Sequence, residues 1–251
     1  MKCYLKLYSL LLILTLTGCT AQVEREGVNK TKASIANSEL GVAYLAKGNY
    51  KVAMYKLKRA LDFDEDNVHA HHYIAELYRR LEQNKLAQEH FEIALDLNEE
   101  DSAIKNNYGI FLCGTGSYKK GMKYFNEVLL DPLYGNKGVV YENMGLCSEK
   151  LGNIRHAENY FSTALKFNKK LPSSLLSLAQ IEFDKGHVAK ASSFLTRHKK
   201  LSRPGSQAIW LELLIARKKG LKGRVGTLVI KLKQNFPESK ETLLVEKLKL
   251  R

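Results

Sequence analysis

The sequence predicts an all-α solenoid of about six stacked helical hairpins, because three columns of residues recur along the chain at one shared period. In every column the successive spacings are 34, 34, 36 and 34 residues. A period between 20 and 50 residues is typical of repeat proteins, whose units bury their apolar faces only against neighbouring units. The columns are Gly41, Ala75, Gly109, Gly145 and Ala179; Ala53, Ala87, Gly121, Ala157 and Ala191; and Leu57, Phe91, Phe125, Phe161 and Leu195.

The period and the residue types are those of the tetratricopeptide repeat, a hairpin of two antiparallel helices. Small residues are expected where the two helix backbones approach most closely, and the large apolar residue fills the gap to the next hairpin. Gly48, Gly116, Gly152 and Gly186 stand where each first helix should end, since glycine favours the C-terminal cap. The second repeat has Gln83 and Asn84 near this point, a weaker turn signal.

Six repeats are predicted over residues 34–239. Their bounds are 34–67, 68–101, 102–135, 138–171, 172–205 and 206–239. The two additional residues fall in the loop Asp131–Lys137, which contains Pro, Gly and Asn. The sixth repeat is weaker, with Val225 and Val229 at its core positions. Residues 240–251 are predicted to form a capping helix over the last apolar face.

The N-terminus reads as an export signal with a lipid attachment site. Lys2 and Lys6 precede an apolar run, Leu7–Leu16, that is too short to span a bilayer as a helix. The following residues, up to Cys19, resemble the bacterial lipobox. The resemblance implies a signal peptide over residues 1–18, a covalent lipid on Cys19 as the only cofactor, and a lipidated tether over 19–33. The alternative is an ordinary secretory signal in which Cys19 stands by chance.

By resemblance to the enteric sorting rule, Thr20 after the cysteine implies the outer membrane, on its periplasmic face. The formal net charge is +14. In a cytosolic protein such a charge would suggest nucleic acid, but an exported chain does not routinely meet any, so we expect no nucleic-acid partner. The basic surface is either simply solvated or attracted to anionic lipid head groups or an acidic partner.

No catalytic motif is present, so we expect neither an enzyme nor a small-molecule substrate. The best metal candidate is the group His69, His71 and His72, in which His69 and His72 share a helix face. Because no third ligand is apparent on that face, we expect no metal. The histidines are interpreted as partner contacts or as plain surface residues.

Cys113 and Cys147 fall in the first helices of the third and fourth repeats, at nearly the same position within each. First helices of successive repeats are neighbours, and a disulfide needs Cα atoms about 4.4–6.8 Å apart. We therefore hypothesise a Cys113–Cys147 disulfide in the oxidising envelope. The alternative is a pair of buried free thiols.

The segment Asn106–Cys113, with Cys147 in the next repeat, resembles the type IV pilus biogenesis and stability lipoproteins, the PilF and PilW family. Pro132–Tyr134 and the ending Asn235–Ser239 support the same resemblance. It implies a pilotin, which binds the type IV pilus secretin subunit and helps it reach the outer membrane and form its ring. The family also implies the same disulfide. The strong positive charge and the weak sixth repeat depart from the family.

A partner is expected to bind in a groove lined by the first helices of the first three repeats, where exposed apolar and polar groups mix. Changes at Val42 and Leu45 are expected to abolish binding without unfolding the protein. The competing functions are a general envelope scaffold for outer-membrane protein assembly or protease adaptation, and an enzyme with a helical-repeat body. The predicted groove residues are Ile35, Ser38, Val42, Leu45, His69, His72, Glu76, Arg79, Asn106 and Ile110.

Overall fold

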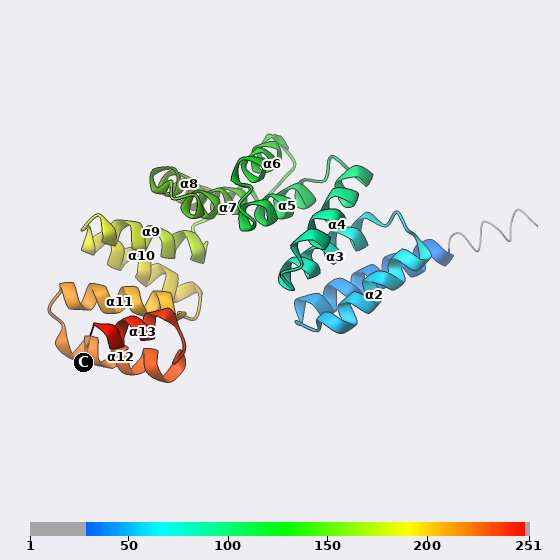
Figure 1. The fold of residues 1–251 in the computed structure, drawn as a ribbon. Coiled ribbons are helices and arrows are strands. Elements are labelled where there is room, and N and C mark those ends of the chain that lie inside the picture. Colours follow the sequence, from blue (N-terminus) through cyan, green and yellow to red (C-terminus); the bar gives the residue numbers. More distant parts are fainter. Residues whose placement is uncertain (1–28, 249–251) are drawn as a thin grey trace, which may run out of the picture. The chain divides into compact units, whose positions relative to one another are not determined.

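The computed structural model describes residues 29–248, which form 13 helices and no strand (Figure 1). This confirms the all-α prediction. The predicted signal peptide and Cys19 lie outside the described residues. The chain divides into two compact units, residues 1–108 and 109–251, and the boundary falls within one helix. Each unit has apolar core clusters of its own.

The helices follow one another as pairs joined by short turns, and a single helix ends the array (Figure 1). The structure places the first helix over residues 29–46, so helix begins before residue 34, inside the segment that was expected to be a tether. Residues 29–33 carry no apolar stripe that periodicity could detect. The other helices are α2 (Tyr50–Phe63), α3 (Val68–Arg80), α4 (Asn84–Leu97), α5 (Ser102–Gly114), α6 (Tyr118–Leu130), α7 (Lys137–Lys150), α8 (Ile154–Phe167), α9 (Pro172–Asp184), α10 (Val188–Leu201), α11 (Ser206–Lys218), α12 (Lys222–Asn235) and α13 (Lys240–Lys247).

The turn inside each hairpin requires one residue in the left-handed backbone region. Glycine occupies this position in five hairpins, for example Gly48 at φ 74°. In the second hairpin Glu82 takes it instead, at φ 59°, so the turn lies just before Gln83 and Asn84. A residue with a Cβ is disfavoured in this backbone region. The turn of the second hairpin therefore has an unfavourable conformational energy that glycine avoids in the other turns.

The recurring small residues lie where the two helices of a hairpin approach each other most closely, as predicted. A Cβ added to Gly145 in α7 would lie 2.5 Å from Cε1 of Phe161 in α8. A Cβ on Gly109 would lie 2.7 Å from the ring of Phe125. Both phenylalanines are fully buried. Large rings thus occupy the volume that a side chain on the facing helix would need.

In unit 1, hydrogen bonds tie the first repeat to the second. The Ser34 hydroxyl donates to the Ala60 carbonyl at 2.9 Å, and the Asn67 amide donates to Ser34 Oγ at 2.6 Å. Asn67 also caps α3, because its Oδ1 accepts from the Ala70 amide. These buried polar groups are therefore all satisfied, and they fix how α3 meets the first hairpin.

In unit 2, a disulfide joins Cys113 of α5 to Cys147 of α7, with a Cα–Cα distance of 5.4 Å. Both cysteines are buried in a core cluster against which Tyr134 of the connecting loop also packs. A Cβ on Gly121 of α6 would lie 2.6 Å from Cys113 Sγ, so the second helix comes close to the bridge. The cross-link therefore lies inside the apolar core of the middle of the array.

No helix in the described part of the chain is both long and apolar enough to cross a membrane.

A methyl group at the closest helix approach should destabilise the protein. We expect Gly145→Ala to lower the free energy of unfolding by about 1–3 kcal/mol, because the buried Phe161 ring must move. Ala75 faces Phe91 at the equivalent positions of the second repeat, so a helix pair can adapt to such a methyl group and the fold should survive. Gly226→Ala in α12, where a Cβ meets nothing within 4 Å, is the matched control and should stabilise by about 0.5–1 kcal/mol. Urea unfolding followed by circular dichroism measures both, and equal effects would contradict the packing account.

Loss of the disulfide should also destabilise the protein. Replacing both Cys113 and Cys147 by alanine should lower the free energy of unfolding by about 2–4 kcal/mol, because the unfolded chain regains the freedom that the cross-link removes. Urea unfolding of the variant, and of the unmodified protein with and without reductant, tests this. An unchanged midpoint after complete reduction would show that the bridge contributes nothing.

Candidate partner-binding face

The first helix, residues 29–46, exposes an apolar face. Ile35 is 48% exposed and Leu40 is 44% exposed, and the half-buried Val42 lies two helical turns after Ile35. The exposed side of this helix also carries alanines 36, 43 and 46, and its charges include Lys32, Glu39 and Lys47. A helix side with large exposed apolar residues that no described element of unit 1 covers is typical of a surface that binds a partner.

The structure corrects two of the predicted groove positions on this helix. Leu45 is 2% exposed and belongs to the core cluster of unit 1, so it cannot contact a partner. Ser38 is buried, and its hydroxyl donates to the Ile35 carbonyl at 2.8 Å. The cluster around Leu45 includes residues of both α2 and α3. The expectation that changes at Leu45 leave the fold intact is therefore wrong.

In α3, the predicted residues divide between surface and interior. His69 is exposed, and its ring meets the ring of Tyr73 edge-on at 4.7 Å. Arg79 is partly exposed and pairs with the buried Glu76 through two hydrogen bonds, Nε to Oε1 at 3.1 Å and Nη2 to Oε2 at 2.9 Å. This pairing raises the pKa of the Arg79 guanidinium. Glu76 thus orients Arg79 rather than facing a partner itself.

His72 is buried, contrary to the exposed position expected for a groove residue. The Asn107 amide nitrogen of α5 lies 2.8 Å from His72 Nε2, so Nε2 accepts and the neutral ring carries its proton on Nδ1. Burial lowers the pKa of His72, although the nearby Glu76 and Asp101 raise it in part. His72 therefore acts as a neutral link between α3 and α5.

The last two predicted groove residues, both in α5, are not freely exposed. Asn106 is buried, and its amide donates to Asn107 Oδ1 at 3.3 Å. Ile110 belongs to unit 2, where it packs partly buried against the cluster that contains the disulfide. The predicted face therefore reduces to Ile35, Val42, His69 and Arg79. The sequence reasoning missed Leu40, which lies two residues from Ser38 and from Val42, and Tyr73, which lies one helical turn after His69.

The histidines of α3 do not share one site. His71 faces away from His72, toward α4, where its Nδ1 lies 2.9 Å from Nδ1 of His90. His71 Nε2 donates to the Glu65 carbonyl at 2.9 Å, so Nδ1 must accept and His90 must donate. Burial, and then the neighbouring His71, lower the pKa of His90. Within residues 29–248, no group of three or more His, Cys, Asp or Glu side chains could hold a metal ion.

Comparison with known proteins shows the family to which the chain is related. Residues 138–171, the predicted fourth repeat, match the family model described as Tetratricopeptide repeat. The type IV pilus assembly protein PilF of Pseudomonas aeruginosa is 27% identical over 235 residues, which cover 92% of this chain and 93% of that protein. The chain belongs to the family of type IV pilus tetratricopeptide-repeat proteins.

Solved structures of the same family agree. The fold matches a structure of Pseudomonas aeruginosa PilF with a TM-score of 0.77 and 25% identity, over 88% of this chain and 99% of that one. It matches PilW, described as a widely conserved type IV pilus biogenesis factor, with a TM-score of 0.73 and 29% identity, over 84% of this chain and 97% of that one. Tetratricopeptide-repeat proteins bind other proteins, and the members of the family are non-catalytic repeat proteins.

The buried histidines should make unfolding depend on pH. Because His72 and His90 have lowered pKa values when folded, the unfolded chain takes up protons first as the pH falls below about 6.5. The free energy of unfolding should therefore be lower at pH 5.5 than at pH 7.5. Urea unfolding of a His72→Gln/His90→Gln variant should show a smaller difference between the two pH values. The exposed His156→Gln is the control; if it removes the difference equally, the buried pair is not its source.

Proposed function

We propose that this chain is a pilotin: an outer-membrane lipoprotein, anchored on the periplasmic face by acyl chains on Cys19, that binds the type IV pilus secretin subunit. It helps the secretin to reach the outer membrane and to form its ring, which pilus biogenesis and stability require. The observation that supports this most is the match to PilF along nearly the whole of both chains, with the same fold. The lipobox resemblance at Cys19 supports the membrane anchor.

The apolar face of the first helix is the proposed contact with the secretin subunit. Ile35 and Leu40 present large side chains to solvent, and the half-buried Val42 lies two helical turns after Ile35. His69 and Tyr73 of α3 add aromatic rings, and Arg79 adds a charge held in place by Glu76. An apolar centre with a few polar groups around it is the arrangement that protein interfaces use.

In this account the protein does no chemistry on its partner. The exposed face captures a segment of the secretin subunit, and the acyl chains hold the complex at the membrane. Two or more acyl chains give stable attachment, whereas a single chain binds only marginally. Anchoring and capture therefore involve different parts of the chain, and each can be removed without the other.

Negative charge on the apolar face of the first helix should prevent binding of the partner. An Ile35→Asp/Leu40→Asp variant should lower the recovery of the secretin subunit at least tenfold, when the tagged, lipidated protein is purified from its own envelope and analysed by mass spectrometry. Unchanged circular dichroism would show that the fold is intact, as expected for exposed positions. Leu133→Asp/Leu130→Asp, also at exposed leucines, is the control and should leave recovery unchanged.

Several results would contradict the proposal. Full secretin recovery with the Ile35→Asp/Leu40→Asp variant would show that the face is wrong. Recovery of barrel-assembly factors or a protease in place of the secretin would favour the general scaffold. A Cys19→Ser variant should still bind the secretin subunit but should leave the outer-membrane fraction, and its retention there would overturn the lipid anchor.

A further inference from the structure

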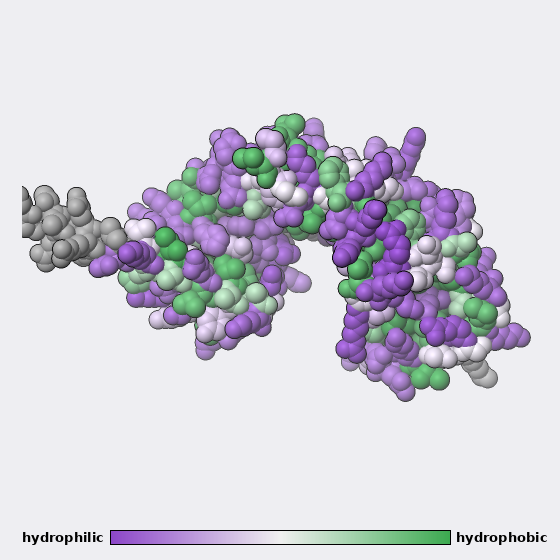
Figure 2. Space-filling view, turned by 180° about the vertical axis from the view of Figure 1, so that it is seen from behind, coloured by the Kyte–Doolittle hydropathy of each residue, from purple (hydrophilic) through white to green (hydrophobic). Residues whose placement is uncertain are grey.

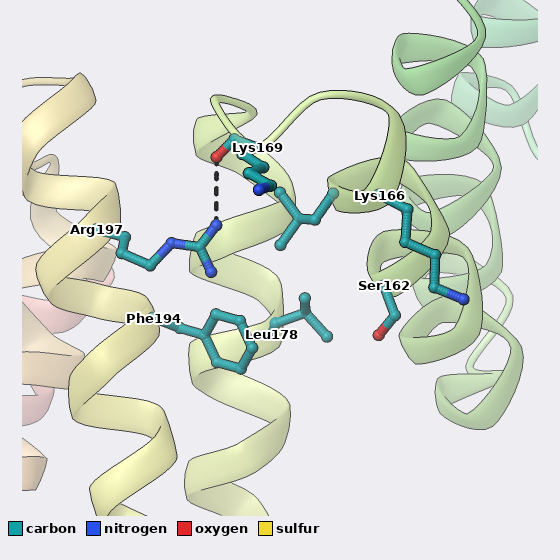
Figure 3. Close-up of a pocket in the computed structure, with 7 residues that line it drawn as sticks. Ser162, Lys166, Lys169, Leu178, Phe194 and Arg197 are labelled. Atoms are coloured by element: carbon teal, nitrogen blue, oxygen red, sulfur yellow. Dashed lines mark hydrogen bonds between the residues drawn. The ribbon is translucent and has the colours of Figure 1, made fainter.

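Unit 2 contains a pocket of about 580 Å³ between α8, α9 and α10 (Figure 3). Its apolar lining consists of Leu165 from α8, Leu178 from α9 and Phe194 from α10. Its volume falls within the range of about 300–1,000 Å³ that is usual for ligand sites. It belongs to the fourth and fifth repeats and shares no residue with the proposed secretin face of unit 1.

The polar lining of this pocket is cationic. Lys166, Lys169 and Arg197 line it together with Ser162, and no acidic residue does. Arg197 Nη2 donates to the Lys169 carbonyl at 3.3 Å, and its guanidinium lies 5.7 Å from the Phe194 ring centroid. In Figure 3 Arg197 extends from α10 over the apolar floor, while Ser162 and Lys166 come from α8 on the other side. Among the described residues, none of the three cations forms an ion pair with a carboxylate.

The next repeat has a carboxylate where this pocket has part of its apolar floor. A shift of 34 residues takes Leu178 to Glu212 and Leu165 to Lys199. There the Glu212 carboxylate accepts from Lys199 Nζ at 2.7 Å and from Arg224 Nη2. Burial acts to raise the pKa of Glu212, but these two hydrogen bonds outweigh it and hold the pKa below its ordinary value. At this position the sixth repeat carries its own carboxylate among cations.

The pocket has the apolar Leu178 and Leu165 at the positions of Glu212 and Lys199, and its three cations lie at other positions around them. Grouping three cations beside an apolar floor, without a carboxylate, leaves repulsion that an anion would relieve. The floor also presents apolar surface whose burial is favourable. A ligand that satisfies both features must carry an anionic group directly beside an apolar one.

We propose that this pocket binds an acidic segment of a protein partner. One carboxylate of the segment lies near Lys169 and Arg197, and a neighbouring apolar side chain packs on Leu178 and Phe194. In a peptide, acidic and apolar side chains stand next to each other, as the pocket requires. In a lipid, by contrast, polar glycerol separates the phosphate from the acyl chains. The site is therefore a second protein-binding site, independent of the first-helix face.

The test uses the purified full chain and a fluorescein-labelled, end-blocked ten-residue peptide that alternates Glu and Phe. Fluorescence anisotropy should show binding that weakens with salt, because charge contributes to it. A Lys166→Glu/Lys169→Glu variant should weaken binding at least tenfold. The control is Lys200→Glu/Arg203→Glu, which changes the net charge equally at the equivalent positions of the next repeat and should change binding less than twofold. Circular dichroism checks that both variants are folded.

Two further probes separate the possible ligands. A peptide with Gln in place of Glu should bind at least tenfold more weakly, and vesicles of phosphatidylglycerol and phosphatidylethanolamine should bind both charge variants alike. Equal losses in both variants, or no peptide binding by the unmodified chain at millimolar concentration, would overturn the proposal. Vesicle binding that only the Lys166→Glu/Lys169→Glu variant loses, without peptide binding, would assign the pocket to lipid phosphate and would also overturn it.

Discussion

The close approach of two helices at a residue with little or no side chain is the contact on which the rest of this array depends. Phe161 fills the space that a side chain at position 145 would occupy, and Phe125 does the same opposite Gly109. Each large ring is wholly buried, so a tightly packed contact holds the two helices of the hairpin together. Because these contacts hold the two helices of a hairpin together, the other faces of each helix can carry charged residues, hydrogen bonds to neighbouring helices or an exposed apolar surface.

The fold could be predicted from the sequence because that contact leaves a periodic trace, in which small and large residues alternate at fixed positions. The candidate site could not be predicted as well. Along the first helix leucine occurs both in the core, as Leu45, and on the surface, as Leu40, and the two differ only in angle around the axis. The burial of His72 was likewise not predicted, because its ring contacts Asn107, 35 residues later in the chain. Residue type reveals the hairpin, whereas exposure depends on neighbours that the local pattern does not contain.

The net charge of the chain has an uneven distribution. Residues 185–251 contain 17 Lys and Arg but only 4 Asp and Glu, so most of the positive excess lies in the last two repeats. In Figure 2 hydrophilic side chains cover much of these repeats, with smaller apolar patches between them. Glu212 already satisfies two of the cations. The basic character that departs from the family is thus a property of one end of unit 2, which is where an anionic partner would be attracted.

The disulfide makes the resistance of the third and fourth repeats to unfolding depend on oxidation. In a reducing compartment Cys113 and Cys147 are thiols, and the third and fourth repeats are held only by packing. After oxidation the same packing is locked by a covalent bond within the core, and opening these repeats then requires either much greater disruption or a reductant. A chain whose two thiols are still reduced is therefore easier to unfold than the cross-linked one. The middle of the array becomes stiffer only when these two thiols are oxidised.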